Sequence, residues 1–463
     1  MALRSALDNV AFPALLGGPA AELMALLRQF DASEHWPAAR MAQAQAAQLR
    51  LVLRQAMTIP FHAARLREAG LAEPPADDAA FWAAWRRLPV LRRRDLQEQG
   101  TALHAPAVPQ AHGPVMEVAS GGSTGQPVRV RKAALERQFW LALQLREEEW
   151  NRENPHATIA RLRGIPPGLA PELVAKACSP EGLLLPDWGP PATLLWQTGP
   201  VGLMDSQVPV AVQADYVARL GAEYLFMFPS SLRVLLQHCR DHAIRLPALR
   251  SVWTLSEAVE PELRALCREV LGVRIVDNYS SAETGYIALQ CPASDAYHAM
   301  SETVLLEVVD ESGAPCPPGA TGRVLVTPLH NFAMPLLRYE IGDEAELAEG
   351  CPCGRTLPVL SRIHGRILDH VLLPDGTRQR AALQHYDLSR IAPLREFQVV
   401  QKSRALIEMR MVVARTLDAA EVAAVRAALV KSFGDGFRYD LRFMETIPRT
   451  PAGKLRPFLC EAV

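Results

Sequence analysis

A short loop between two apolar, strand-like runs carries the residues of this chain best suited to chemistry. It reads Ser120, Gly121, Gly122, Ser123, Thr124, Gly125, Gln126 and Pro127. Glycine permits positive φ and lets a phosphate approach backbone N–H groups, while Ser and Thr add short hydrogen-bond donors. The loop is therefore predicted to bind an oxyanion, although an ordinary turn can have the same composition.

Three further segments carry isolated functional side chains. DNYSSAETG (277–285) follows the strand-like run VRIV, so Tyr279 and Glu283 are expected at the carboxyl end of a strand, where α/β proteins bind ligands. Asp343 follows Gly342, which is expected in a turn, a geometry suited to vicinal sugar hydroxyls, and PRTPAGK (448–454) presents Lys454 on a stiff loop. Each segment alone could equally be a capped turn or a solvated charge.

A second set of residues has the composition of a metal site. Cys291 and His298 bracket the segment CPASDAYH, and Cys351 and Cys353 form a C-x-C pair. Three thiols and one imidazole supply the four ligands of tetrahedral zinc and leave no open position, so the metal is expected to be structural. Unrelated half-buried thiols are the alternative, since C-x-C is tighter than the usual spacing, and Cys316 could replace one ligand. The other cysteines have the surroundings of ordinary helix or loop residues; they are Cys178, Cys239, Cys267 and Cys460.

The elements that must position these residues fall into three stretches. Apolar residues recur at intervals of three and four from about residue 19 to 99, which predicts a helical layer. From about 115 to 364, short apolar strands alternate with helical segments, which predicts a mixed sheet covered by helices. After His364, the pattern reads β-β-α-β, a small unit of its own. The predicted class is mixed α/β.

Composition limits the possible functions. With 463 residues, two or three domains are expected. Lys and Arg (49) nearly balance Asp and Glu (50), which argues against nucleic acid or an anionic membrane as an obligatory partner. No apolar run approaches the roughly 18 residues of a spanning helix, and MALRSALDNVAFPALLGG lacks the features of a signal peptide. We expect a cytoplasmic protein, either a monomer or a homodimer.

The four segments, in this order and at these separations, resemble those of the acyl-adenylate-forming (AMP-binding) enzyme superfamily, and within it the phenylacetate-CoA ligase-like branch. SGGSTGQP resembles its phosphate loop, NYSSAETG its adenine and magnesium segment, RYEIGD its ribose segment and PRTPAGK its catalytic lysine loop. The helical lead-in and LPVLRRRDL also resemble that branch. The resemblance covers nearly the whole chain. It implies a large N-terminal domain (1–367, with 1–100 mainly helical) and a small C-terminal lid (368–463).

The resemblance also implies a reaction and its participants. A carboxylic acid would attack the α-phosphate of ATP, and the resulting acyl-AMP would pass its acyl group to an acceptor, commonly CoA. Lys454 would bridge the α-phosphate and the carboxylate, Glu283 would bind Mg²⁺, and Thr124 would act on the β- and γ-phosphates. The other nucleotide contacts implied are Ser120, Gly121, Gly122, Ser123, Gly125, Ser256, Glu257, Ala258, Asn278, Tyr279, Ser280, Asp343 and Arg366. Some members of the branch also have cysteines and a histidine at the zinc positions.

Several departures from the family pattern keep alternatives open. Gln126 stands where a lysine is common, Ala282 replaces a hydroxyl residue, and Leu368 occupies the place of the usual hinge aspartate. Adenylation is therefore better supported than transfer to CoA, so the acceptor could be an amine or a carrier protein. A non-catalytic nucleotide-binding homologue is the third alternative. The aromatic side chains near the expected acyl pocket suggest an aryl or arylacetic acid, although they could equally be core residues; they are Phe139, Trp140 and Trp196.

Overall fold

The computed structural model describes residues 3–10, 12–119, 128–166, 168–366, 370–373, 377–380, 388, 391–449, 455–456 and 458–462. The chain divides into two units. The first comprises residues 1–157, 186–200 and 276–365, and the second comprises residues 158–185, 201–275 and 366–463. Among the described residues, every helix is too short or too polar to span a lipid bilayer.

Helices open the first unit, as the spacing of its apolar residues predicts. They are α1 (Gly18–Ser33), α2 (Ala38–Ala56), α3 (Pro60–Ala69), α4 (Asp78–Arg87) and α5 (Arg93–Gln99), followed by the short 3₁₀ helices η1 (Gly100–Leu103) and η2 (Gln110–His112). Asp77 caps α4 by accepting a hydrogen bond of 2.8 Å from the backbone N–H of Ala80. Leu49, Leu66 and Phe81 share one fully buried core. The predicted helical lead-in is confirmed.

A two-stranded antiparallel sheet frames the predicted phosphate loop. β1 (Val115–Ala119) pairs with β2 (Arg129–Ala133), with Ala119 opposite Arg129. α6 (Ala134–Trp150) follows β2 directly, and Glu136 accepts a hydrogen bond of 3.1 Å from the backbone N–H of Ala133 at its start. The two strands thus bring both ends of the loop together, while residues 120–127 lie outside the described residues.

The larger sheet of the first unit carries most of the candidate site residues. In the described part of the chain its order is β11-β12-β13-β14-β10-β9-β8. The strands are β8 (Arg274–Ser281), β9 (Gly285–Gln290), β10 (Tyr297–Ala299), β11 (Val304–Val309), β12 (Thr321–Pro328), β13 (Tyr339–Ala348) and β14 (Val359–Arg366). β8 and β9 form a hairpin in which Ser281 lies opposite Gly285, whose φ of +83° suits glycine. The short helix α8 (Ala192–Leu195) also belongs to this unit.

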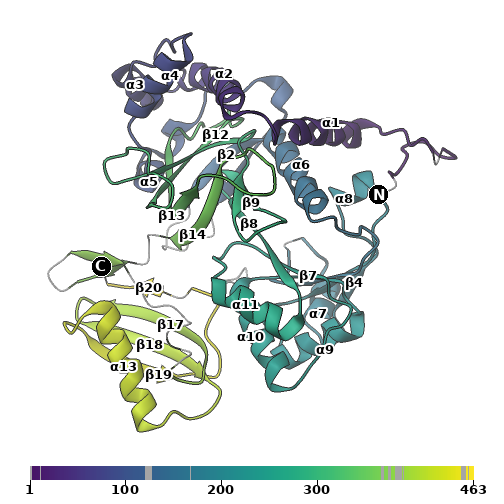
Figure 1. Cartoon of the computed structure of the whole chain (residues 1–463), viewed down its shortest axis with the longest axis vertical. Helices are drawn as coiled ribbons and strands as arrows, with labels where there is room; N and C mark the ends of the chain where they lie inside the picture. Colours follow the sequence, from purple (N-terminus) through teal and green to yellow (C-terminus); the bar gives the residue numbers. More distant parts are fainter. Residues whose placement is uncertain are drawn as a thin grey trace. The chain divides into compact units, whose positions relative to one another are not determined.

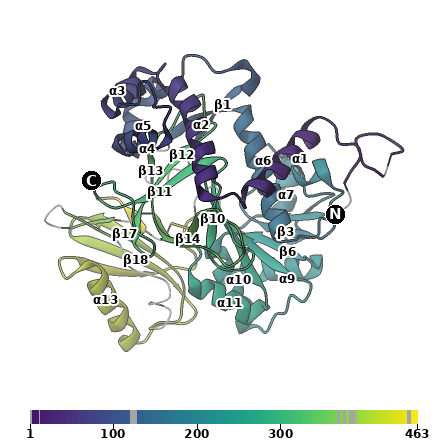
Figure 2. The same ribbon diagram turned by 45° about the horizontal axis from the view of Figure 1, so that its top comes forward.

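The second unit contains a mostly parallel sheet, with strand order β7-β6-β3-β5-β4. Its strands are β3 (Ile159–Leu162), β4 (Leu183–Leu185), β5 (Val201–Met204), β6 (Tyr224–Met227) and β7 (Ser251–Thr254), of which β4 runs antiparallel to β5. The accompanying helices are α7 (Pro171–Ala177), α9 (Val210–Leu220), α10 (Pro229–Asp241) and α11 (Pro261–Leu271). Leu225 and Val252 pack with Leu235 of α10 in one core, and Figure 2 shows α9 beside β6. The predicted alternation of strands and helices is confirmed.

The C-terminal part of the second unit has its own sheet, in the order β19-β18-β17-β20. Its elements are β15 (His370–Leu372), β16 (Arg378–Arg380), β17 (Leu394–Ser403), β18 (Leu406–Val413), α13 (Ala419–Phe433), β19 (Arg438–Phe443) and β20 (Phe458–Cys460). α13 lies along this sheet (Figure 1), and Phe397, Met409 and Leu429 share its core. The predicted β-β-α-β order is confirmed. The domain boundary at 367/368 stays a prediction, because residues 367–369 lie outside the described part.

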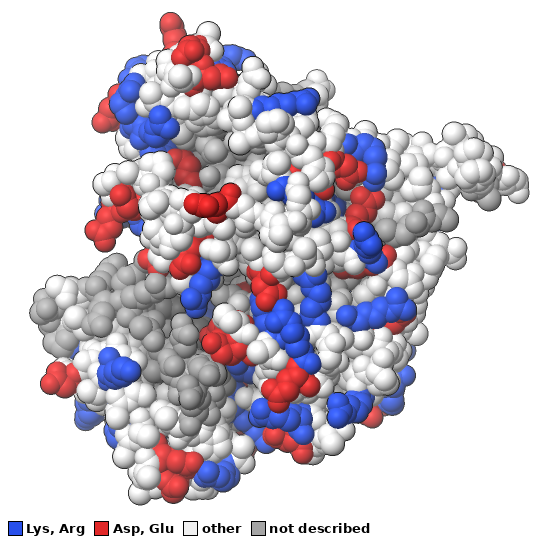
Figure 3. All heavy atoms as spheres, in the orientation of Figure 1, with Lys and Arg blue, Asp and Glu red and all other residues white. Residues whose placement is uncertain are grey.

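Acidic and basic side chains are interspersed over the face of the molecule shown in Figure 3. This distribution agrees with the formal net charge of −1.

Candidate functional site

The predicted adenine and ribose residues of the first unit are in direct contact. Tyr279, on β8, donates a hydrogen bond of 2.6 Å from its hydroxyl to Oδ2 of Asp343, on β13. Asp343 is only 8% exposed. Gly342, expected in a turn, instead lies inside β13 with φ +89°, where the pairing with β12 changes register between Arg323 and Leu325. A bulge rather than a turn therefore directs the carboxylate toward Tyr279.

Glu283, predicted to bind magnesium, is 3% exposed and lies beside a cation. Nη1 of Arg93, in α5, is 3.4 Å from Oε1 of Glu283. Burial lowers the pKa of Lys132, and the nearby charges of Glu136 and Glu283 oppose this. The sequence analysis did not single out Arg93. A sequence signal for Arg93 did exist, namely the run of three arginines, 92–94, where α5 begins. The helix dipole disfavours cations at this end, so three of them together indicate another role.

Asn278 and Ser280 form a partly buried hydrogen-bonded group with α6. Nδ2 of Asn278 donates to Oε1 of Glu147 at 3.3 Å, and the Ser280 hydroxyl donates to Oδ1 of Asn278 at 3.1 Å. Burial raises the pKa of Glu147 to about 8, and the charge of Asp277 adds to the rise. Glu147 is therefore largely protonated at neutral pH, which spares the molecule a buried negative charge. Sequence reasoning did not identify Glu147, which has no motif around it.

The predicted adenine-lining residues of the second unit follow β7. Ser256 and Ala258 are exposed, and Glu257 is half-buried. Ser256 has φ +68°, a conformation that is uncommon for residues other than glycine and often marks a functional site. Glu257 accepts hydrogen bonds from the backbone N–H and the hydroxyl of Ser230, at 2.9 and 3.2 Å. This segment lies at the carboxyl end of a parallel strand, the usual ligand edge.

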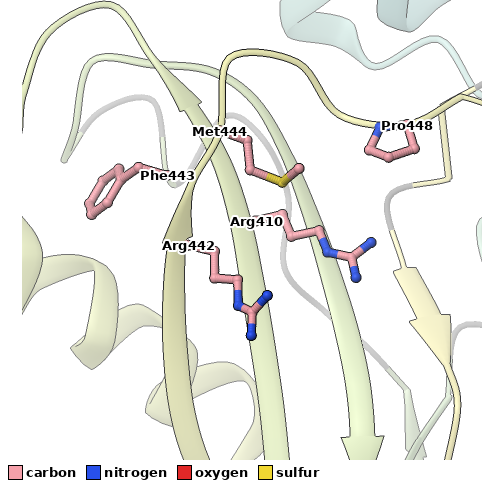
Figure 4. A pocket seen from close by; sticks show the side chains of 5 residues that line it. All are labelled: Arg410, Arg442, Phe443, Met444 and Pro448. Carbon is pink, nitrogen blue, oxygen red and sulfur yellow. The ribbon is translucent and has the colours of Figure 1, made fainter.

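The remaining predicted residues of the nucleotide site are not described in full. Residues 120–127, Leu368 and Lys454 lie outside the described residues. Arg366 ends β14, but its side chain is also outside them. Ahead of the lysine loop, a cavity of about 590 Å³ is lined by Arg410, Arg442, Phe443, Met444 and Pro448. Figure 4 shows the two arginines on the same side of neighbouring strands, where they are opposite each other in the β18–β19 register.

Two of the three aromatic residues predicted near the acyl pocket make stacking contacts in the first unit. The ring of Phe139 stacks on His330 with centroids 4.0 Å apart, and that of Trp140 lies 4.4 Å from Tyr286. Trp140 is 36% exposed, so part of its face is available to a ligand. Trp196 is 2% exposed and is a core residue.

The four predicted zinc ligands converge in the first unit. The ligand atoms of Cys291, His298, Cys351 and Cys353 all lie within 4.8 Å of one another. Sγ of Cys353 is 3.2 Å from Nε2 of His298, and Sγ of Cys291 is 3.5 Å from Sγ of Cys351. Such separations suit one ion with bonds of about 2.0 to 2.3 Å to nitrogen and sulfur. Cys316, the alternative ligand, is not part of this group and packs against Gly322 instead.

The surroundings of the cluster favour metal binding. Burial lowers the pKa of His298 to about 4, so its imidazole is neutral at physiological pH. Nδ1 of His298 is 3.4 Å from the carbonyl oxygen of Leu357, which leaves Nε2 to face Cys353. The ring of Trp150 packs edge-on against His298 at 5.8 Å, and the guanidinium of Arg355 lies 4.1 Å from the Trp150 ring centroid. The cluster is thus held in place from outside.

Comparisons with known proteins show which families and folds this chain is similar to. Residues 192–333 match the family model for AMP-binding enzymes, and residues 387–459 match the one for the CapK C-terminal domain. A phenylacetate-coenzyme A ligase of Thermus thermophilus is 31% identical over 159 residues, which are 33% of this chain and 36% of that protein. The matched segment thus spans about a third of this relative.

Solved structures show the likeness over nearly the whole chain. A 2-hydroxyisobutyryl-CoA ligase in its postadenylation state with 2-HIB-AMP has a TM-score of 0.67 at 19% identity, covering 93% of this chain and 91% of that one. An open conformation of a 2-hydroxyisobutyryl-CoA ligase with 2-HIB-AMP and CoA has a TM-score of 0.56 at 20% identity, covering 92% of each chain. The fold is that of the adenylate-forming enzymes. The resemblance predicted from the four sequence segments is confirmed.

Proposed function

We propose that this protein is an ATP-dependent, AMP-forming ligase that activates a carboxylic acid as its acyl-adenylate and transfers the acyl group to CoA. The observation that carries the proposal is the contact between Tyr279 and Asp343, 64 positions apart in the chain, in a fold shared with adenylate-forming ligases. In the same unit, Glu283 is held next to Arg93. One side chain for the base, one for the ribose and one for the phosphates are the minimum set that an ATP site needs.

The first step of this reaction must overcome repulsion between a carboxylate and a triphosphate. Catalysis therefore depends on positioning and on cations and N–H groups that face the charge developing in the transition state. The loop of residues 120–125 would hold the β- and γ-phosphates, and Lys454 would bridge the α-phosphate and the attacking carboxylate. Arg93 adds a cation beside Glu283 and so compensates in part for Gln126, where the family often has lysine. Magnesium, bound by Glu283, would neutralise phosphate oxygens.

We also propose that Cys291, His298, Cys351 and Cys353 bind one structural zinc ion. The support is the convergence of three thiols and one neutral imidazole within 4.8 Å. Four protein ligands fill a tetrahedral site, so no position is left for a substrate or water. The cluster would therefore stabilise the first unit and take no part in the reaction.

The acid and the acceptor are the finer parts of the proposal. The exposed part of Trp140, whose ring is tilted by 41° against that of Tyr286, suits a flat aromatic acid such as an aryl or arylacetic acid. A second candidate function, transfer to an amine or a carrier protein, is favoured by Leu368 in place of the hinge aspartate. Location in the cytoplasm and the oligomeric state stay predictions.

Pyrophosphate exchange into ATP tests the proposal directly. Purified protein is assayed with a panel of aliphatic, aryl and arylacetic acids, with and without CoA. Acid-dependent exchange is the expected result, and its absence with every acid would favour a non-catalytic nucleotide-binding protein. CoA-dependent release of AMP identifies the thioester ligase, whereas exchange without such release points to another acceptor. Metal analysis of the same protein should give one zinc per chain.

A further inference from the structure

One side chain fastens the segment that leads into the lysine loop. Arg449 is largely buried, with 13% of its side chain exposed. Its Nη1 donates to the hydroxyl oxygens of Ser230 and Ser231, both at 3.2 Å, at the start of α10. Its Nη2 pairs with the carboxylate of Glu396 in β17. A planar guanidinium can donate to the two serine hydroxyls and to the Glu396 carboxylate at the same time, whereas a lysine ammonium is a single point charge.

Ser230 continues this connection to the predicted adenine-lining segment. Its hydroxyl accepts from Arg449 and donates to Oε1 of Glu257 at 3.2 Å, and its backbone N–H donates to Oε2 of the same carboxylate at 2.9 Å. Arg233 and Glu260 tie α10 to this segment a second time, at 2.5 Å. Hydrogen bonds therefore run without interruption from Glu257 through Ser230 to Arg449.

We propose that Arg449 is a positioning residue for acyl-adenylate formation. Through Ser230 and Ser231 it holds the start of the lysine loop in a fixed position relative to the adenine-lining segment. The inference rests on the proposed function. Lys454 follows Arg449 by five residues, and five extended residues span at most about 17 Å. Fastening Arg449 thus restricts where Lys454 can be, and preorganisation of this kind lowers the barrier of the step that uses the lysine.

The two half-reactions should respond differently. The bridge between the α-phosphate and the carboxylate is needed while the acyl-adenylate forms, and the transfer step begins after that bond exists. Loss of Arg449 should therefore slow adenylation and leave transfer from preformed acyl-adenylate nearly unchanged. A merely structural role would reduce both steps together.

The experiment compares R449A with R438A, which removes an exposed arginine from β19 of the same sheet. Pyrophosphate exchange is measured with an acid that the wild-type protein activates, and transfer is measured as CoA-dependent AMP release from the chemically prepared adenylate of that acid. R449A should lower exchange by about 100-fold, the scale of a misplaced catalytic group, with R438A close to wild type. Unchanged exchange, or equal losses in both steps, would overturn the proposal.

A variant cycle tests whether the serines act through Arg449. S230A/S231A should lower exchange as R449A does, although less, because the pairing with Glu396 remains. When the three substitutions are combined, the loss should match that of R449A alone, since the groups form one connected unit. R449K should recover only part of the activity. Losses that multiply in the combined variant would show that the serines and Arg449 act separately.

Hydrogen–deuterium exchange tests the contact independently of activity. In R449A, backbone amides of residues 444–449 and of the first turn of α10 should exchange faster than in wild type and R438A. If the wild-type protein shows no pyrophosphate exchange with any acid, the proposed function fails, and this measurement still reports on the contact. Equal protection in R449A and wild type would show that Arg449 does not hold the segment.

Discussion

The two predicted sites of this molecule are built in opposite ways. The four predicted zinc ligands all belong to the first unit, and their ligand atoms lie within 4.8 Å of one another. The residues predicted to contact the nucleotide come from both units, with Tyr279 and Asp343 in the first and Ser256 to Ala258 in the second. A structural metal needs four ligands in one fixed arrangement, whereas the proposed reaction needs cations and N–H groups that face the charge developing in its transition state. The following predictions test this contrast, beginning with the largest expected effect.

Replacing the proposed catalytic lysine should strongly reduce the activity of the predicted nucleotide site without unfolding the protein. Lys454→Ala should lower pyrophosphate exchange by about a thousandfold, because a cation facing transition-state charge is lost. ATP binding, measured by calorimetry, should change little. The control is Lys402→Ala, which removes a lysine that pairs with Glu461 at 2.7 Å in the same part of the chain. Normal exchange in Lys454→Ala would show that the lysine assignment is wrong.

Replacing one predicted zinc ligand should instead lower the stability of the protein and leave pyrophosphate exchange intact. Cys351→Ser should reduce zinc from one ion per chain to nearly none and lower the thermal unfolding midpoint, because metal binding contributes to folding free energy. Exchange measured well below that midpoint should persist.

Cys316→Ser is the matched control for the zinc prediction. Cys316 is also buried but lies outside the cluster, so this variant should keep its zinc. Zinc retained in Cys351→Ser and lost in Cys316→Ser would reverse the ligand assignment.

The contact between base and ribose residues should affect nucleotide binding moderately. Asp343→Asn removes a charged acceptor from Tyr279 and from the ribose hydroxyls, and should raise the KM for ATP by about tenfold. Tyr297→Phe provides the comparison, because Tyr297 donates an equally short hydrogen bond of 2.6 Å to Asp277. It should alter stability but not the KM. Equal changes in the KM for ATP in the two variants would show that the Tyr279–Asp343 pair has no specific role in nucleotide binding.

The smallest expected effect concerns the pH dependence of stability. Burial raises the pKa of Glu147 to about 8, far above the unfolded value of about 4.3. The folded state therefore keeps a proton that the unfolded state releases between these values. This contribution is complete below about pH 4 and is lost as the pH rises to 8, by up to about 1.4 kcal/mol per unit.

Glu147→Gln should flatten this part of the profile, measured by urea unfolding between pH 5 and 8, because glutamine does not titrate. Glu421→Gln, at a half-buried carboxylate whose pKa is lowered by its hydrogen bond to Arg415, is the control. An unchanged slope in Glu147→Gln would mean that Glu147 is ionised in the folded protein.

Tyr279 and Asp343 could be proposed from the sequence because ligand chemistry restricts which residue types can bind a nucleotide. A base needs an aromatic or backbone platform and a ribose needs an acceptor, so Tyr279 and Asp343 stood out within their segments. Their contact at 2.6 Å agrees with the roles that the resemblance implies. The helices of the lead-in were predictable for a different reason, because the spacing of their apolar residues follows the helical repeat.

Features that depend on packing between distant segments could not be anticipated. Arg93 reaches Glu283 across 190 positions, and Glu147 reaches Asn278 across 131. The run of arginines 92–94 is a local signal for Arg93, but the partner in each pair cannot be assigned from the sequence, since each contact follows from how helices lie against the sheet. Gly342 was expected in a turn for a similar reason, because a bulge and a turn both favour a residue with positive φ.

The segment that follows the predicted zinc ligands Cys351 and Cys353 contacts the end of α1. The backbone N–H of Thr356 donates to the carbonyl oxygen of Glu34 at 2.8 Å, and Arg355 pairs with the Glu34 carboxylate at 3.0 Å. Thr356 and Glu34 are 322 positions apart in the chain. At typical rates of synthesis, the ribosome needs on the order of 15 to 60 seconds to add that length. The contact of the end of α1 with Thr356 therefore forms late in synthesis, whereas the hydrogen bonds that Arg146 and Trp150 of α6 donate to the Glu34 carboxylate, from 112 and 116 positions away, can form much earlier.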